Sequence, residues 1–483
     1  MGLRALSLVS GAARTTPPDL LIARQQMALS LGWHIIVASL GIGLPAMILI
    51  AEWRHLRTGE PAYDQIARRW SKALAILFAV GAVSGTVLSF EFGVLWPGLI
   101  GNFGDVIGLP FAVEGVAFFL EAIFLGIYLN GRDRLTPRAH FLAGIPIVGS
   151  GIASAAFVVM ANAWMNHPQG FTLVNGDIHH LTNVNPVKAA FNPATPVEVT
   201  HLLLASLMVA GFAVAAVYAA GLLRGRRDRY HRLAFAIAFT VAVAATPLQI
   251  VAGDWAARFI AAKQPTKLAA AEGLYRTQAH APLHIGGLPD GHGGLKFAIQ
   301  IPDGLSLLAH GSPHAAVQGL DATAPALQPP VAVVHVAFDL MVGIGFGLLV
   351  LGAWWLRLVR RRRRGRGADW ASSKWFLWPA LAAGPAAATA MEAGWVVTEV
   401  GRQPWIVYHV LLTADAVTTA HGIRACYYVV SGVYTLLTVV TILALRRIGR
   451  DAAGREPPPA DAEGFRHGDE GGSPAVLTRA LGR

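Results

Sequence analysis

The sequence predicts an all-α polytopic membrane protein with nine transmembrane helices. Its composition is the first reason: 54% of the residues are hydrophobic and only 14% are charged, whereas about 25% are charged in an average soluble protein. The second is that apolar segments of about 20 residues or more, the length that spans a bilayer, recur along the chain. The third is that Lys and Arg concentrate in alternate connections between these segments. Together these observations exclude an ordinary soluble globular protein.

Each predicted helix is an apolar run with polar residues at its ends. Residues 20–253 contain the first six helices and residues 331–449 the last three. Residues 1–19 are predicted to form an N-terminal extension, and residues 450–483, rich in Gly, Pro and charged residues, a disordered cytoplasmic tail. The nine spans cover residues 22–51, 73–96, 107–130, 139–164, 197–223, 232–253, 331–357, 375–400 and 423–446.

The basic residues predict the orientation of the chain. The connections after spans one, three, five and seven contain "EWRHLRTGEPAYDQIARRW", "GRDRLTPR", "LRGRRDRYHR" and "RLVRRRRRGRG". By the positive-inside rule these connections are cytoplasmic, so the N-terminus lies outside and the C-terminus in the cytoplasm. The net charge of +11 is then explained by topology and by contacts with anionic membrane lipid, and nucleic acid is not an expected partner.

The connection between the sixth and seventh spans, residues 254–330, is a long outside loop. Its first part, "RFIAAKQPTKLAAAEGLYRTQ", predicts an amphipathic helix. Its second part, "APLHIGGLPDGHGGLKFAIQIPDG", predicts turns and short extended segments. A loop of this length in a membrane protein is commonly functional.

Two glutamates interrupt the third span, "PFAVEGVAFFLEAIFLGIY". Glu114 and Glu121 are seven residues apart, close to two helical turns, so both lie on one face of the helix. A charged side chain at the centre of a bilayer costs about 2.5–3.5 kcal/mol on insertion scales, which makes such residues functional candidates. Other ionisable residues within predicted spans include His34, Glu91, His201, His335, Asp339, Glu392 and Glu399.

Several of these candidates fall in the outer halves of their spans. Histidine, methionine and carboxylate side chains on different helices at one depth form a ligand set suited to haem iron in a helix bundle. His34, His201, Met341, Glu399 and Glu114 are such a set. The same side chains also serve as hydrogen-bonding and packing contacts between helices. The residues alone leave both interpretations open.

Six stretches together resemble subunit I of the cytochrome bd quinol oxidases, including the cyanide-insensitive branch. The resemblance covers residues 20–447. The stretches are "ARQQMALSLGWH", "WSKALAILFAVGAVSGTVLSFEFG", "VIGLPFAVEGVAFFLEAIFLG", "ANAWMNHPQG", "QPTKLAAAEGLYRTQ" and "EAGWVVTEVGRQPW".

This resemblance implies a set of bound cofactors. They are two haem b and one haem d, with haem b as the alternative to haem d. His201 and Met341 match the axial ligands of a low-spin haem b. His34 and Glu399 match the axial ligands of a pair formed by a high-spin haem b and a haem d, and Glu114 matches a position that faces the oxygen-reactive iron.

Residues outside the ligand set also match functional positions of the family. Lys267 and Glu272 match quinol-binding loop residues implicated in quinol oxidation. Arg402 lies where it would neutralise haem propionates or the Glu399 carboxylate. Two positions depart from the family pattern. Asp339 stands where better-known members of the family have arginine, and this change should lower the potential of the low-spin haem. Glu91 stands where glutamine is usual in the family.

The implied activity is that of a terminal oxidase in the bacterial cytoplasmic (inner) membrane. Ubiquinol or menaquinol would be oxidised at the outer face and O2 reduced to water with protons from the cytoplasm. Glu114 and Glu121 would form two steps of a proton relay, because burial raises a carboxyl pKa and lets the group exchange protons. The implied partners are a homologous membrane subunit II and a small accessory subunit.

Three other functions would also place ionisable residues within membrane helices. A haem–copper oxidase needs clustered histidines within its helices, and no predicted span supplies them. A secondary transporter usually has two related halves with broken helices, which the sequence does not show. A bd-like b-haem electron conduit or sensor without oxygen reduction remains open, although it would have no need of Glu114, Glu121 and "GRQPW" together.

Overall fold

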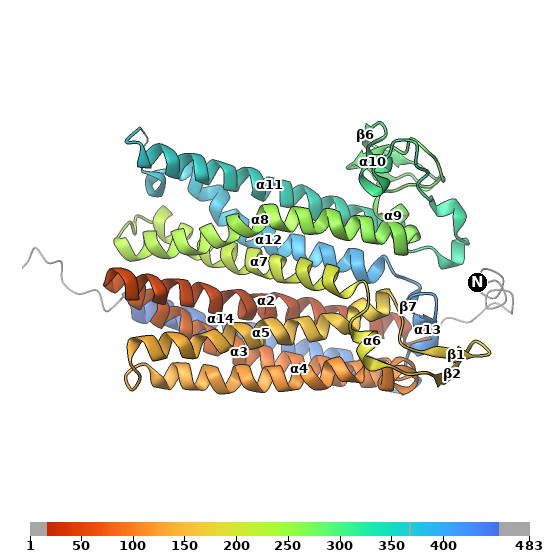
Figure 1. The fold of residues 1–483 in the computed structure, drawn as a ribbon, viewed down its shortest axis with the longest axis horizontal. Coiled ribbons are helices and arrows are strands. Elements are labelled where there is room, and N and C mark those ends of the chain that lie inside the picture. The colour runs from red at the N-terminus through yellow and green to blue at the C-terminus, as the bar shows by residue number, and fades with distance from the viewer. Residues whose placement is uncertain (1–16, 367–368, 454–483) are drawn as a thin grey trace, which may run out of the picture.

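The computed structural model describes residues 17–366 and 369–453 and shows long helices that lie side by side along one axis (Figure 1). Within these residues, eight helices are long and apolar enough to cross a membrane. The chain is therefore a multi-pass membrane protein with a mostly helical fold. The eight are α2 (Leu20–Thr58), α3 (Pro61–Leu95), α4 (Pro97–Gly131), α5 (Pro137–Asn166), α7 (Thr195–Leu223), α8 (Arg229–Lys263), α11 (Val331–Arg363) and α14 (Ile423–Ala453).

The predicted eighth span, 375–400, is the helix α12 (Lys374–Val400), which is not one of those eight. Its Trp, Pro and Glu residues dilute its aliphatic content, so hydropathy alone does not mark it as a span. Aromatic contacts nevertheless hold it in the bundle. The Phe376 ring centroid lies 5.5 Å from that of Phe239 on α8 and 5.6 Å from that of Trp355 on α11.

The connection predicted at residues 52–72 is almost entirely helical, which corrects the first two spans. Helix α2 continues to Thr58 and α3 begins at Pro61. Gly59 adopts φ 67°, a left-handed conformation that favours glycine, and its N–H bonds the carbonyl of His55 to end α2. Pro61 then stands at the first turn of α3, where its missing N–H is harmless.

Three further helices extend beyond the predicted spans. Helix α4 begins at Pro97 rather than near residue 107, α8 continues to Lys263, and α11 runs through the arginines to Arg363. Hydropathy detects only the apolar part of a helix, so polar turns at its ends are missed. Helix α14 likewise continues to Ala453, into the predicted tail. The rest of that tail and residues 1–16 of the predicted extension lie outside the described residues.

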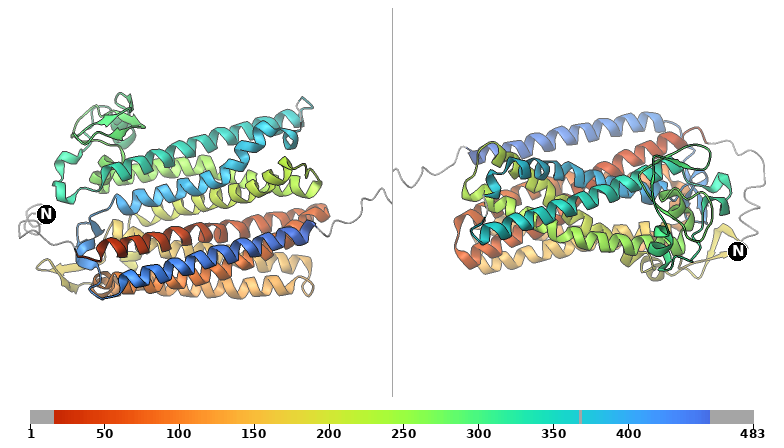
Figure 2. Two further views of the ribbon diagram at one scale, coloured as in Figure 1. Left: turned by 180° about the vertical axis from the view of Figure 1, so that it is seen from behind. Right: turned by 90° about the horizontal axis from the view of Figure 1, so that it is seen from above.

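Figure 1 shows that most of the short elements gather at one end of the bundle, and both views of Figure 2 agree. We call the end that carries residues 264–330 the loop end. The opposite end carries the connections after α2, α4, α7 and α11, and we call it the basic end. The basic end also has the 3-10 helix η3 (Trp370–Ser372).

The loop end contains both helix and extended segments, but the helix predicted over residues 258–278 is interrupted: residues 258–263 belong to α8, and the separate helix ends at Ala271. The long loop holds α9 (Pro265–Ala271), β3 (Leu283–Ile285) paired antiparallel with β6 (Ile299–Ile301), β4 (Leu288–Pro289) paired antiparallel with β5 (Leu295–Lys296), α10 (Gly304–His310), η1 (Leu320–Ala322) and η2 (Pro325–Leu327). The other connections there hold β1 (Thr172–Val174) paired with β2 (Asp177–Thr182), α6 (Pro186–Ala190), β7 (Trp405–Val407) paired with β8 (Leu411–Leu412), and α13 (Thr413–Ala416).

Close packing of α2 against α7 provides a stability prediction. A Cβ added to Gly43 would overlap the Ala210 Cβ and lie 3.2 Å from the Ser206 backbone oxygen. Gly43→Ala should therefore destabilise the protein by about 1–3 kcal/mol through overpacking, seen as a lower unfolding temperature of the purified protein. Gly41, two residues earlier, has nothing within 4 Å of its added Cβ. Gly41→Ala is the matched control, and equal unfolding temperatures for the two variants would contradict the prediction.

Candidate functional site

The candidate carboxylates of α4 lie against one polar face of α5. Ser154 donates a hydrogen bond to Glu114 Oε1 at 3.0 Å. One turn away on the same face, a Cβ built on Gly151 would lie 3.4 Å from Glu121 Oε1. Glu121 is buried, with 7% of its surface exposed. Both glutamates thus face α5, which confirms that their seven-residue spacing places them on one side of α4.

The same face of α5 holds the Glu399 carboxylate nearer the loop end. Asn162 donates to Glu399 Oε1 through its side-chain amide. Arg402, which is 2% exposed, donates to Glu399 Oε2 at 2.6 Å. The Nε and Nη1 atoms of Arg402 are buried and have no hydrogen-bond partner among the described residues. A buried guanidinium with two free nitrogens is suited to bind a second anionic group.

Asn166, one turn beyond Asn162, joins the long loop to this site. Its Oδ1 accepts a hydrogen bond from Lys267 Nζ at 2.9 Å. Its amide nitrogen lies 2.9 Å from both Asn162 Oδ1 and Glu198 Oε1. The side chains of Lys267, Asn166, Asn162 and Glu399 therefore form one hydrogen-bonded series from α9 to α12.

The two loop residues predicted to bind quinol are both buried at the end of α9. Lys267 is 2% exposed and Glu272 is 4% exposed. Burial and the neighbouring Arg402 guanidinium lower the pKa of Lys267. Burial, and secondly the Asp339 carboxylate, raise the pKa of Glu272 to about 8. Each side chain can therefore change its protonation state close to neutral pH.

Side chains and backbone around Glu272 fix the end of α9. His284 Nδ1 bonds the Glu272 backbone oxygen at 2.8 Å, and His335 Nδ1 bonds the Ala271 backbone oxygen at 2.7 Å. His335 Nε2 lies 3.3 Å from Asp339 Oδ2. Asp339, the departure from the family pattern, thus lies beside the loop as well as two residues before Met341 on α11.

The three predicted histidine and methionine ligands lie at three different contacts between helices. His34 Nδ1 on α2 bonds Ser84 Oγ on α3 at 2.8 Å. His201 Nε2 on α7 lies 3.0 Å from Gln249 Nε2 on α8. The Met341 sulfur on α11 lies 3.0 Å from the position of a Cβ on Gly394 of α12. Helix α12 also approaches α2, because Glu392 Oε2 lies 3.1 Å from the position of a Cβ on Gly32.

Some of the predicted site residues therefore lie close together in the structure, and others lie on separate helix contacts. Glu114, Glu121, Glu399, Arg402 and Lys267 are joined through the polar face of α5. His201 and Met341 contact different neighbours, α8 and α12, within the group formed by α7, α8, α11 and α12. His34 contacts α3 on the other side of α2. Glu91, the second departure, accepts a hydrogen bond from Gln26 at 2.9 Å and is 4% exposed.

Sequence reasoning missed Glu198, Asn162 and Asn166. Glu198 stands in the first turn of α7 and Asn166 is the last residue of α5, where polar residues are expected at the edge of a membrane. The structure shows that Asn166 hydrogen bonds both Lys267 on α9 and Glu198, a set of contacts that the sequence does not reveal. The one available signal was two asparagines one turn apart, in "ANAWMNHPQG".

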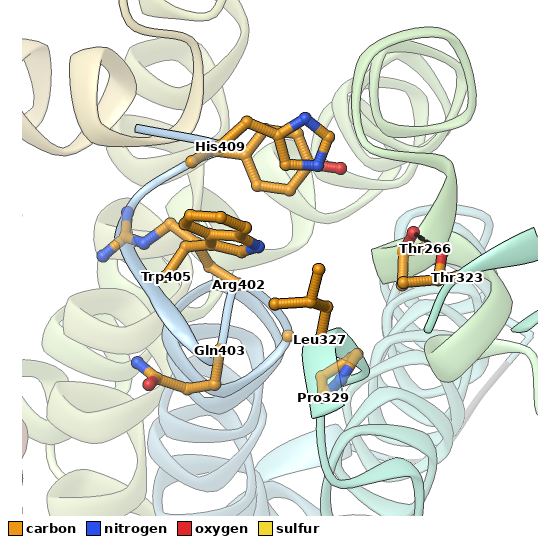
Figure 3. Close-up of a pocket in the computed structure, with 10 residues that line it drawn as sticks. Thr266, Thr323, Leu327, Pro329, Arg402, Gln403, Trp405 and His409 are labelled. Atoms are coloured by element: carbon orange, nitrogen blue, oxygen red, sulfur yellow. Dashed lines mark hydrogen bonds between the residues drawn. The ribbon is translucent and has the colours of Figure 1, made fainter. Parts of the chain in front are cut away.

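A small cavity lies between the long loop and the segment after α12 (Figure 3). The Thr266 and Thr323 hydroxyls, 2.8 Å apart, lie on one side of it. Arg402 and Trp405 lie on the other side in Figure 3. Its volume of about 30 Å³ accommodates about one water molecule. In this conformation the cavity is therefore too small for a quinol ring. The remaining lining residues are Leu327, Pro329, Gly401, Gln403, Tyr408 and His409.

Comparison with known proteins identifies the family. Residues 22–453 match the family model described as "Cytochrome bd terminal oxidase subunit I". A solved structure, the bd oxidase from Geobacillus thermodenitrificans, superposes with a TM-score of 0.85 at 39% identity and covers 91% of this chain and 100% of its own.

Two Bacillus subtilis (strain 168) proteins are also similar over most of their length. One is provisionally named as subunit I of a cytochrome bd menaquinol oxidase and is 37% identical over 435 residues, which are 88% of this chain and 96% of that protein. The other is cytochrome bd ubiquinol oxidase subunit 1, 31% identical over 454 residues, 90% of this chain and 94% of that protein. The chain belongs to the cytochrome bd terminal oxidase subunit I family.

Proposed function

We propose that this chain is the haem-bearing subunit of an electrogenic quinol oxidase. It oxidises quinol at the loop end and reduces O2 to water. The observation that carries this proposal is the hydrogen-bonded series from Lys267 through Asn166 and Asn162 to Glu399, because it connects the long loop to a carboxylate that could ligate haem iron. Oxygen uptake by the purified complex with reduced quinone tests it, and a complex without uptake would disprove it.

The residues present fit haem. Ser84 holds His34 through Nδ1 and leaves Nε2 for iron, and Gly85 leaves the ring uncrowded, with a Cβ position 3.2 Å from His34 Cε1. The two unpaired nitrogens of Arg402 suit haem propionates. When bound, haem supplies electron transfer and oxygen reduction. The set proposed is two haem b and one haem d, or haem b in place of haem d.

The proposed ligands follow the donor preferences of haem iron. His201 and Met341 would hold the low-spin haem. His34 and Glu399 would hold the other two, with Glu114 facing the oxygen-reactive position. Asn162 and Arg402 fix the Glu399 carboxylate from two sides, so its orientation is set before any ligand binds.

Quinol oxidation releases protons, and Glu272 would accept one. Its carboxyl pKa of about 8 makes the ionised form a good proton acceptor near neutral pH. Lys267, whose pKa is lowered by burial and by Arg402, would bind the quinol oxygen. Two quinols and one O2 give two quinones and two waters. Because quinol protons leave at the loop end and those for water enter from the basic end, turnover separates charge.

Protons for water would reach the site along α4. Glu121 would receive a proton from the basic end and pass it to Glu114, about 10 Å nearer the loop end at 1.5 Å rise per residue. Ser154, hydrogen bonded to Glu114, keeps that carboxyl on the α5 face.

The proposed topology has nine spans, which are the eight apolar helices described above and α12. The basic end then lies in the cytoplasm and the loop end outside, in a bacterial cytoplasmic membrane. Large apolar side chains on the outer faces of the bundle, such as Phe90 at 71% and Phe119 at 67% exposed, would meet lipid or a homologous subunit II, with a small accessory subunit as a further partner. The quinol is ubiquinol or menaquinol.

The role of Glu272 predicts a pH dependence. The ionised fraction of a carboxyl with a pKa of about 8 increases as the pH rises through that value, so the quinol oxidation rate should rise from about pH 7 to about pH 9. Glu272→Gln should be slow at every pH and lose this rise, with its haem spectrum unchanged. Gln300→Ala, at an exposed position of β6 in the same loop, is the control. An unchanged rate and pH profile in Glu272→Gln would remove Glu272 from the mechanism.

A further inference from the structure

Three buried side chains near the basic end form a closed hydrogen-bonded cluster. Glu52 on α2 is 5% exposed, His140 on α5 is 2% exposed and Tyr128 on α4 is 2% exposed. Glu52 Oε1 lies 2.5 Å from His140 Nδ1, and the Tyr128 hydroxyl donates to Glu52 Oε2 at 2.5 Å. Three helices thus place a carboxyl, an imidazole and a phenol in one desolvated cluster. The function proposed above uses none of them.

The geometry of His140 requires one proton to be shared within this cluster. His140 Nε2 lies 2.9 Å from the Tyr128 backbone oxygen, and a carbonyl oxygen can only accept, so Nε2 carries a hydrogen. The contact between His140 Nδ1 and Glu52 Oε1 then needs one more proton between the two atoms. The pair is either imidazolium with carboxylate or imidazole with carboxylic acid, and each form holds that proton.

The cluster connects to the exposed surface of the basic end through Arg132. Arg132 Nη2 lies 3.4 Å from the Tyr128 hydroxyl. Arg132 Nη1 donates to Asp64 Oδ1 at 2.6 Å, and the Asp64 side chain is 27% exposed. Asp64 also pairs with Arg68, whose side chain is 49% exposed. Water can therefore reach the outer side of this cluster.

On its inner side the cluster continues the line of the two glutamates on α4. Tyr128 follows Glu121 by seven residues, as Glu121 follows Glu114, so all three lie on the α5 face at intervals of about 10 Å. Glycines stand opposite on α5. A Cβ on Gly144 would lie 3.2 Å from the Tyr128 ring, and one on Gly151 would lie 3.4 Å from Glu121 Oε1. α4 and α5 therefore approach closely beside Glu121 and Tyr128.

We propose that the Glu52–His140 pair, held by Tyr128, is the proton-loading group that receives protons at the basic end and passes them to Glu121. This inference rests on the proposed function. The proton shared by Glu52 and His140 moves to the Glu121 carboxylate through water between α4 and α5, since the interval exceeds a hydrogen bond. The pair then regains a proton from water on the Arg132 and Asp64 side.

The competing explanation is that the cluster only anchors the helix ends. Both explanations predict lower stability when the cluster is disrupted, so stability does not separate them. They differ in the rate of oxygen reduction in a folded complex that retains its haems, and in the dependence of that rate on exchangeable hydrogen.

The test is Glu52→Gln in the complete complex, which removes the exchangeable proton with little change of shape. Oxygen uptake should fall by about tenfold or more, with the haem spectrum and the anaerobic rate of haem reduction by quinol unchanged. The rate ratio between H2O and D2O should increase. The double variant Glu52→Gln with Glu121→Gln should be no slower than Glu121→Gln alone, because the two groups act in series.

A structural control is available at the same end of the bundle. Trp70 Nε1 donates to the buried Tyr218 hydroxyl at 2.9 Å. Tyr218→Phe removes a buried hydrogen bond away from α4 and α5, and should lower the unfolding temperature without slowing turnover. If Glu52→Gln fails to assemble, Glu52→Asp and Tyr128→Phe retain the fold more readily and should both slow oxygen uptake and increase the ratio between H2O and D2O.

Each outcome has one meaning. A wild-type complex without quinol-dependent oxygen uptake disproves the proposed function. An active wild type with normal uptake and an unchanged H2O to D2O ratio in Glu52→Gln overturns this inference alone. The same normal behaviour in both Glu52→Asp and Tyr128→Phe overturns it if Glu52→Gln cannot be purified.

Discussion

Replacing Glu399 by alanine should remove the two haems proposed to lie at His34 and Glu399, while the low-spin haem proposed for His201 and Met341 remains. The carboxylate is the proposed iron ligand, and alanine has no donor atom. The change also leaves the buried Arg402 guanidinium without the carboxylate that now pairs with it at 2.6 Å. Leaving a buried guanidinium without its partner destabilises the protein, which adds to the loss of the ligand.

The measurement is a reduced-minus-oxidised spectrum of the purified variant complex, with extracted haem quantified per protein. Thr398→Ser, a small change at the preceding residue of α12, is the control and should keep all haem signals. Retention of the complete haem set in Glu399→Ala would show that Glu399 is not a ligand.

Replacing Glu121 by glutamine should slow oxygen reduction by about a hundredfold with all haems retained. Glutamine has nearly the same shape as glutamate, so its packing beside Gly151 on α5 should be preserved. A Cβ added to Gly151 would lie 3.4 Å from Glu121 Oε1. An amide cannot release a proton at physiological pH, so proton delivery to Glu114 would stop at this position. The rate of haem reduction by quinol under anaerobic conditions should not change, because that reaction occurs at the loop end.

Oxygen uptake and anaerobic haem reduction, measured on the same preparation, separate the two half-reactions. Glu60→Gln tests whether any carboxylate near the basic end has this effect, since Glu60 forms a surface ion pair with Arg229 at 3.2 Å. It should have normal oxygen uptake. Full activity in Glu121→Gln would exclude the relay.

The positions of the long helices could be predicted from sequence because the apolar core of each span carries a direct hydropathy signal. Their ends could not, since the polar turns of α2 near Glu52 and of α4 near Pro97 lie outside the apolar windows. Helix α12 forms where it was predicted, but its Trp, Pro and Glu content keeps it below the hydropathy of the other spans.

Site residues that lie close together in the sequence could be predicted, whereas contacts between distant segments could not. Glu114 and Glu121 share one helix, so their seven-residue spacing alone places them on a common face. The contact of Asn166 with Lys267 joins residues 101 apart in the sequence, and the contact of Glu52 with His140 joins residues 88 apart. No periodicity within one segment encodes such pairs. They arise only when α5 packs against α2, α4 and α9, which requires the folded chain.

The most direct test of the proposed oxidase activity is a reduced-minus-oxidised spectrum of the purified complex, repeated with carbon monoxide and followed by haem extraction. We expect a low-spin haem b, a high-spin haem b and a third haem, haem d or haem b, with a clear response to carbon monoxide. A single low-spin haem b without a carbon monoxide response would contradict it. The chain would then be an electron conduit that keeps the fold of the family without its oxygen chemistry.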